Sequence, residues 1–144
     1  MKVADILAAK GNEVMSVRPS ETILTFAHRL RMARVGAMIV SGDGRKILGI
    51  ISERDVTYGF ATHGLDLAEM HVSDLMNTGV VTCSPSDTIA EIAKIMTRRR
   101  IRHLPVQEND NAIGIVSIGD IVKHRLDEME LEANVLRDYA IARS

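Results

Sequence analysis

Gly49-Ile50-Ile51-Ser52-Glu53-Arg54-Asp55-Val56 is followed, 65 positions later, by Gly114-Ile115-Val116-Ser117-Ile118-Gly119-Asp120-Ile121. Each stretch is a short apolar run that leads into Ser-x-x-Asp, which is a helix capping pattern. Each therefore predicts a buried strand that ends where a helix begins. A pattern of this length that occurs twice indicates an internal duplication.

Two further pairs of blocks support the duplication. Val3-Ala4-Asp5-Ile6-Leu7 is similar to Val72-Ser73-Asp74-Leu75-Met76, and Pro19-Ser20-Glu21-Thr22-Ile23 is similar to Pro85-Ser86-Asp87-Thr88-Ile89. Along the chain the paired blocks lie 69, 66 and 65 residues apart, so only short loop insertions separate the copies. Three blocks in the same order indicate that the duplication covers most of the chain.

Each copy predicts the same order of elements: strand, helix, strand, strand, helix. Apolar residues three, four and seven apart follow each Pro-Ser-acid-Thr turn and form one helix face. Thr88 and Glu91 can form a capping box, with Asp87 as the competing N-cap. Residues 57–70 join the copies and are predicted to be partly helical, with Gly59 and Gly64 as breakers. The predicted strands are residues 14–17, 35–40, 47–51, 80–83, 101–106 and 113–116.

The composition favours a folded chain and excludes several functions. The chain has 144 residues, 46% of them hydrophobic and 3% aromatic, which suits one domain or two small ones. A net charge of -1 and few aromatic rings argue against binding to nucleic acid or to anionic membranes. The single Cys83 cannot form an intramolecular disulfide or a zinc site, and the histidines lack metal-ligand spacing. We expect no metal site, no membrane segment and a cytoplasmic protein.

The two Ser-x-x-Asp stretches, together with Arg102-His103-Leu104-Pro105-Val106, resemble the signature of cystathionine-β-synthase (CBS) domains. The resemblance covers nearly all of residues 3–125 in two copies, a Bateman module, and the chain looks like a small stand-alone bacterial CBS-pair protein. It implies an α/β (α+β) fold of two pseudo-twofold-related β-α-β-β-α repeats packed through their sheets. The repeats would span residues 1–65 and 66–125, with a C-terminal helical tail at 126–144.

The resemblance also implies a non-catalytic module that binds adenosine-containing ligands. From the residues alone, Ser-x-x-Asp either caps a helix or uses the helix start to hold phosphate and ribose. The resemblance favours binding, and it implies that repeat 1 supplies the Ser-x-x-Asp of one site while Arg102 and His103 of repeat 2 supply its phosphate contacts. The implied nucleotide-binding residues are Met15, Ser52, Arg54, Asp55, Val81, Arg102, His103, Ser117, Gly119 and Asp120.

The second site, around Ser117, Gly119 and Asp120, departs from this pattern. The strand equivalent to Arg102-His103 is Val35-Gly36-Ala37-Met38, which carries no charge. We expect unequal affinity at the two sites, with Arg34 as a compensating cation. In the basic run 98–103, Arg100 is either part of a solvated helix end or a phosphate ligand.

Residues 122–144 predict one more helix. Leu126, Met129, Ala133, Leu136 and Ala140 alternate three and four apart, as in a heptad stripe. The stripe predicts either a helix packed on its own domain or a tail that crosses to a partner subunit.

The sequence thus predicts a homodimeric sensor of AMP and/or NAD(H) that signals to an unidentified regulated protein by conformational change. ADP, ATP and S-adenosylmethionine are further candidate ligands. Two alternatives stay open: a nucleotide-free dimerising adaptor, and an enzyme with a nicotinamide cofactor.

Overall fold

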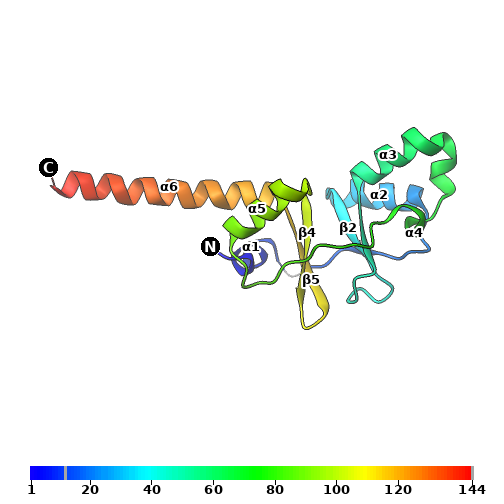
Figure 1. Cartoon of the computed structure of the whole chain (residues 1–144), viewed down its shortest axis with the longest axis horizontal. Helices are drawn as coiled ribbons and strands as arrows, with labels where there is room; N and C mark the ends of the chain where they lie inside the picture. Colours follow the sequence, from blue (N-terminus) through cyan, green and yellow to red (C-terminus); the bar gives the residue numbers. More distant parts are fainter. Residues whose placement is uncertain (12, 144) are drawn as a thin grey trace.

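Two small sheets lie next to each other in the middle of an elongated molecule, with helices at either side (Figure 1). The computed structural model describes residues 1–11 and 13–143. In the first sheet β2 pairs in parallel with β1 and antiparallel with β3, and in the second β4 pairs antiparallel with β5. The elements are α1 (Val3–Lys10), β1 (Ser16–Val17), α2 (Ile23–Ala33), β2 (Ala37–Val40), β3 (Gly49–Ser52), α3 (Glu53–His63), η1 (Gly64–Glu69), α4 (Val72–Leu75), α5 (Ile89–Arg99), β4 (His103–Glu108), β5 (Asn111–Ser117) and α6 (Ile118–Arg143).

The strand pairing confirms the duplication. Ala37 pairs with Ser52 across β2 and β3, and His103 pairs with Ser117 across β4 and β5. The serine of each Ser-x-x-Asp stretch therefore ends its sheet's last strand at the same register position. A helix begins directly after each serine, as the capping pattern predicts.

One predicted strand is wrong. Residues 80–83 form no strand, and only Cys83 makes an isolated parallel bridge to Val106. Its N–H donates to the carbonyl of Pro105 at 3.0 Å, and its carbonyl accepts from the N–H of Gln107 at 2.8 Å. Of residues 80–83, only Cys83 pairs with the edge of β4, and a single pair does not make a strand.

The helix ends show which residue is the N-cap of α5, and they show that one of the two predicted helix breakers, Gly59, does not end a helix. Thr88 is the N-cap of α5 and forms the capping box with Glu91, whereas the Asp87 carboxylate accepts from the N–H of Ser84 at 2.8 Å. Gly64 ends α3, but Gly59 lies buried inside that helix. A Cβ at Gly59 would stand 2.6 Å from Leu75 Cδ2, so this glycine permits close packing and does not break the helix.

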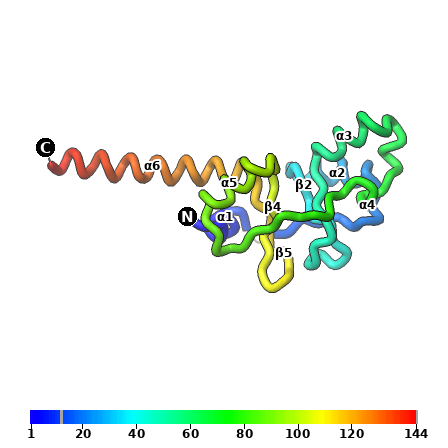
Figure 2. The backbone as a smooth tube through the Cα atoms, viewed as in Figure 1, coloured from blue at the N-terminus to red at the C-terminus, as the bar shows by residue number. Residues whose placement is uncertain are grey.

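The two hydrophobic cores exchange their first helices. Val3, Ile6 and Leu7 of α1 are buried in the core that holds α5 and β4, while Val72 of α4 is buried in the core around Phe26. Backbone hydrogen bonds fix both crossings, from the Val3 N–H to the Asp87 carbonyl at 2.9 Å and from the Val72 N–H to the Glu21 carbonyl at 2.8 Å. The chain can be followed through both crossings in Figure 2. Each repeat therefore contributes its first helix to the hydrophobic core of the other repeat. The predicted boundary between the repeats at residue 65 stays a prediction.

The last helix, α6, is continuous for 26 residues and passes the predicted boundary at 125/126 without a break. Its first turns pack against α5, with Ile121 buried, and then it extends away from the body (Figure 1). Every residue from Met129 to Arg143 is exposed, so packing on its own domain ends at Glu128. No helix in the described part of the chain has the length and apolar character that crossing a membrane requires.

Candidate functional site

Two clefts lie between the repeats, and the predicted site residues divide between them. Cleft 1 has a volume of about 180 Å³ and joins the start of α3 to the start of β4. The residues that line it are Ile50, Ser52, Glu53, Arg54, Asp55, Asn77, Arg100, Ile101, Arg102 and His103. The structure therefore brings together Ser52, Arg54 and Asp55 with Arg102 and His103, as the sequence predicts.

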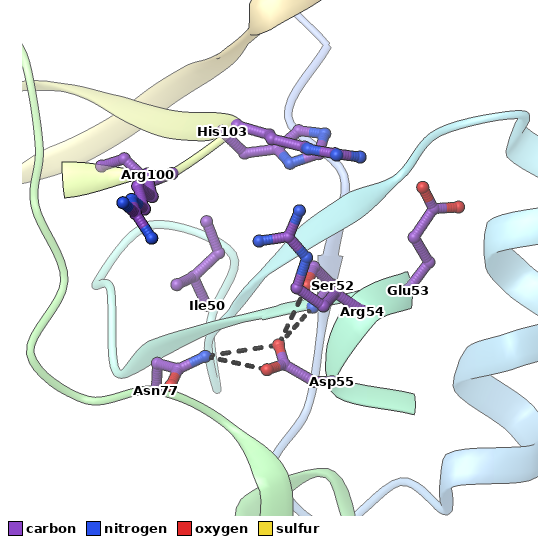
Figure 3. Close-up of a pocket in the computed structure, with 10 residues that line it drawn as sticks. Ile50, Ser52, Glu53, Arg54, Asp55, Asn77, Arg100 and His103 are labelled. Atoms are coloured by element: carbon purple, nitrogen blue, oxygen red, sulfur yellow. Dashed lines mark hydrogen bonds between the residues drawn. The ribbon is translucent and has the colours of Figure 1, made fainter. Parts of the chain in front are cut away.

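The Asp55 carboxylate lies at the floor of cleft 1 and is held by three donors. Its Oδ2 accepts from the Ser52 N–H at 2.8 Å and from the Ser52 hydroxyl at 3.1 Å. The Asn77 amide donates to both carboxylate oxygens at 3.3 Å, and Figure 3 shows this group together. Asp55 thus caps α3 and at the same time presents an oriented carboxylate to the cleft.

Cations surround the rest of cleft 1. Arg54 belongs to the first turn of α3, whereas Arg100 and Arg102 come from the other repeat. Figure 3 shows Arg100 and His103 on the opposite side of the cleft from Asp55 and Asn77, with the Arg54 side chain between the two groups. Arg100 is the C-cap of α5 with φ 53°, a left-handed conformation that non-glycine residues rarely adopt. Backbone strain of this kind is typical of functional sites.

His103 lies between the two clefts and lines both. Burial lowers the pKa of this imidazole below its ordinary value, and the Lys10 and Arg102 charges add to that effect, while Glu53 and Asp120 oppose it. Its ring fills the space above Gly36, where a Cβ would stand 3.1 Å from ring atoms Cε1 and Nε2. In the free protein, burial therefore favours the neutral form of this side chain.

Cleft 2 is the counterpart of cleft 1 around the start of α6. Its volume is about 600 Å³, within the range of small-molecule sites. The residues that line it are Lys10, Gly11, Glu13, Met15, Arg34, Val35, Gly36, Ala37, Glu53, Arg102, His103, Gly114, Ile115, Ser117, Ile118, Gly119 and Asp120. Predicted residues Met15, Ser117, Gly119 and Asp120 lie here, together with Arg34.

The Asp120 carboxylate in cleft 2 has an ionic partner, Lys10, whereas Asp55 forms no ion pair among the described residues. The Asp120 Oδ2 accepts from the Ser117 N–H at 2.9 Å and from the Lys10 ammonium at 2.8 Å. Lys10 also donates to the Ile115 carbonyl at 2.9 Å. Burial by itself would raise the pKa of Asp120, but the bonds from Lys10 and Ser117 outweigh it and lower that pKa.

Four charged or polar residues that the sequence analysis did not name as site residues line the clefts: Asn77, Lys10, Glu13 and Glu53. Glu53 lies inside the first Ser-x-x-Asp stretch, whereas the crossings of α1 and α4 bring Lys10 and Asn77 to the two aspartates. One predicted residue lies in neither cleft, and its role stays a prediction. Val81 packs against the second core and is not among the residues lining either cleft. Among residues 1–11 and 13–143, no group of His, Cys, Asp and Glu side chains could hold a metal ion.

The CBS-domain family model matches residues 3–61 and 72–127, which is most of the chain and includes both clefts' Ser-x-x-Asp stretches. The chain belongs to the CBS-domain family. It carries a tandem CBS pair, a module that is generally regulatory and not catalytic.

Relatives and solved structures agree with this assignment. The crystal structure of the CBS-domain containing protein ATU1752 from Agrobacterium tumefaciens has 38% sequence identity and a TM-score of 0.84, covering 87% of this chain and 99% of that chain. The CBS domain-containing protein CBSX3, mitochondrial, of Arabidopsis thaliana is 28% identical over 95% of this chain and 70% of its own length. A third structure has a TM-score of 0.76 at 21% identity over 85% of this chain and 98% of that chain. It is the CBS domain pair of protein MJ0100 in complex with 5-methylthioadenosine and S-adenosyl-L-methionine.

Proposed function

We propose that this CBS pair is a sensor that binds an adenine nucleotide, AMP and/or NAD(H), between its repeats. The observation that carries the proposal is the arrangement of cleft 1. An oriented carboxylate, Asp55, lies on one side, and the cations Arg54, Arg100 and Arg102 lie around the rest. A ribose diol suits the carboxylate, and a phosphate suits the guanidinium groups. The MJ0100 pair, which binds two adenosine compounds, supports the same ligand class.

The clefts support signalling because each is built from both repeats. A ligand in cleft 1 contacts α3 of repeat 1 and the start of β4 in repeat 2. Such a ligand favours one relative arrangement of the repeats by its differential affinity. The proposal includes a homodimer in the cytoplasm that passes this change to a regulated protein, without catalysis.

Isothermal titration of ligand-free protein with AMP, NAD, NADH, ATP and S-adenosylmethionine tests the proposal. We expect micromolar dissociation constants, about -8 kcal/mol, for AMP or NAD(H). Asp55→Ala combined with Asp120→Ala abolishes the heat in a variant whose thermal melt shows that it is folded. No heat with any ligand would refute the proposal.

A nucleotide-free adaptor is the second candidate, and one observation favours it. Cleft 1 has a volume of about 180 Å³, below the roughly 300 Å³ at which small-molecule sites begin. Arg54, Arg100 and Arg102 are all exposed, however, so their side chains can move outward to admit a ligand. Mass spectrometry of the denatured purified protein distinguishes the candidates, because a co-purified nucleotide excludes the adaptor.

A further inference from the structure

The outer part of α6 is a helix without a packed face. From Met129 to Arg143 every residue is exposed, and the helix extends into solvent beyond the body (Figure 1). The CBS-domain match ends at residue 127, so residues 129–143 lie outside it. A helix of about 15 residues is marginally stable in water by itself. A partner that packs against residues 129–143 would therefore stabilise this part of the helix.

A continuous apolar stripe runs along α6 on the side that its own domain leaves open. Its members are spaced alternately four and three apart, which is the a/d pattern of a two-stranded coiled coil. They stay exposed even where α6 lies against the body, with Val122 at 51% and Leu126 at 60% relative exposure. The stripe consists of Val122, Leu126, Met129, Ala133, Leu136 and Ala140.

The charges beside this stripe define a pairing direction. With Leu126 and Ala133 at a positions, Arg125 and Glu132 occupy g positions, and Glu130 and Arg137 occupy e positions. In a parallel pair, each g residue faces the e residue five positions on in the other helix. Arg125 then meets Glu130, and Glu132 meets Arg137, with opposite charges in both cases. Within the described chain, Glu130, Glu132 and Arg137 form no ion pair, whereas Arg125 already pairs with Glu128 at 2.6 Å. The direction of pairing therefore rests chiefly on Glu132 and Arg137.

We propose that residues 122–140 form a parallel two-stranded coiled coil with the same residues of a second copy of this chain. Full-length antiparallel pairing, centred on residue 131, is disfavoured because it sets Glu130 against Glu130 and Glu132 against Glu132. The parallel pair places both bodies at one end of the coil. This inference does not depend on nucleotide binding, since none of its residues lines either cleft.

Molar mass by light scattering tests the apolar stripe. We expect wild-type protein at twice the 15.8 kDa of one chain. Leu136→Glu, at a d position, shifts the protein to monomers at the same concentration. Leu131→Glu is the matched control, because Leu131 is similarly exposed, at 63% against 69% for Leu136, but lies off the stripe. A monomeric wild type, or a Leu136→Glu variant that keeps the wild-type mass, overturns the proposal.

Charge reversal tests the direction of pairing. Glu132→Arg and Arg137→Glu each raise the dimer dissociation constant about fivefold in sedimentation measurements, because each creates like-charge pairs. The double variant restores the wild-type value, since the opposite charges are exchanged within the same pairs. A shifted antiparallel coil pairs Glu132 with Arg125 instead, so failure of the double variant to restore dimerisation overturns the parallel register. Titration of the same variants with AMP tests the nucleotide proposal separately.

Discussion

The two clefts have the same backbone arrangement but differ in the charged side chains that line them. Both have a serine at the end of a strand, an aspartate that accepts from that serine's N–H, and an arginine in the left-handed conformation at a helix C-cap. Cleft 1 adds Arg54 where cleft 2 has Gly119, and its aspartate receives an uncharged amide where Asp120 receives Lys10. Duplication has thus kept the capping geometry, while substitution has changed the electrostatics around it.

This difference predicts a preference between ligands. In cleft 1 the arginines outnumber the carboxylates, whereas in cleft 2 Glu13, Glu53 and Asp120 balance Lys10, Arg34 and Arg102. An anionic nucleotide is expected to bind more tightly in cleft 1. A less anionic adenosine compound is better accommodated by the larger and electrically balanced cleft 2.

The largest expected effect comes from the paired helix-end arginines. Arg100→Ala weakens AMP binding about 10- to 100-fold, because one or two charge-assisted hydrogen bonds to phosphate are lost. Arg34→Ala, the matched substitution in cleft 2, changes the tight AMP site less than threefold. Isothermal titration of both variants measures this contrast. If both variants lost AMP affinity equally, the two clefts would contribute equally to AMP binding and the predicted preference for cleft 1 would be wrong.

A smaller effect is expected from the ion pair in cleft 2. Lys10→Met frees the Asp120 carboxylate from its 2.8 Å partner, so that it can accept from a ribose diol. Because partly exposed ion pairs are weak, we expect adenosine to bind to cleft 2 about threefold more tightly. Titration with adenosine, in a background of Arg100→Ala, measures this change. Weaker binding would instead identify Lys10 as a ligand-binding group.

The smallest effect concerns pH and the imidazole shared by the clefts. Burial lowers the pKa of His103 in the free protein, and a nearby phosphate raises it, so binding takes up a proton. NAD affinity therefore increases about twofold to threefold as the pH falls from 8 to 6, since its pyrophosphate does not titrate there. The charges that face His103 are Glu53, Lys10, Asp120 and Arg102.

His103→Gln serves as the control for that pH dependence. Gln keeps a polar side chain of similar length but cannot take up the proton. Its NAD affinity is expected to stay constant between pH 8 and 6. A pH dependence that survives in this variant would assign the proton to another group.

Much of the fold was predictable because it rests on local patterns. Each of the two Ser-x-x-Asp stretches at 52–55 and 117–120 ends a strand and starts a helix, and the Thr88 capping box forms within four residues. The apolar run at 80–83 looked like a strand, yet strand formation depends on a neighbour that only Cys83 reaches. Gly59 looked like a breaker, yet its role is set by Leu67 and Leu75, which pack against it.

The site divides in the same way. Ser52, Asp55, Ser117 and Asp120 could be found from the sequence because each pair lies within one capping motif. Asn77 and Lys10 could not, since they reach those carboxylates from segments 22 and 110 residues away along the chain.

By itself, the sequence determined the duplication, the capped helix starts and the residue types that suit a phosphate and a ribose. These depend on contacts between residues a few positions apart, which a pattern records directly. Only the tertiary structure decided that α1 and α4 exchange cores, that His103 lies between two clefts, and that α6 extends beyond its own domain. Those features depend on which distant surfaces bury one another, and the periodicity of a single segment contains no information about its partner.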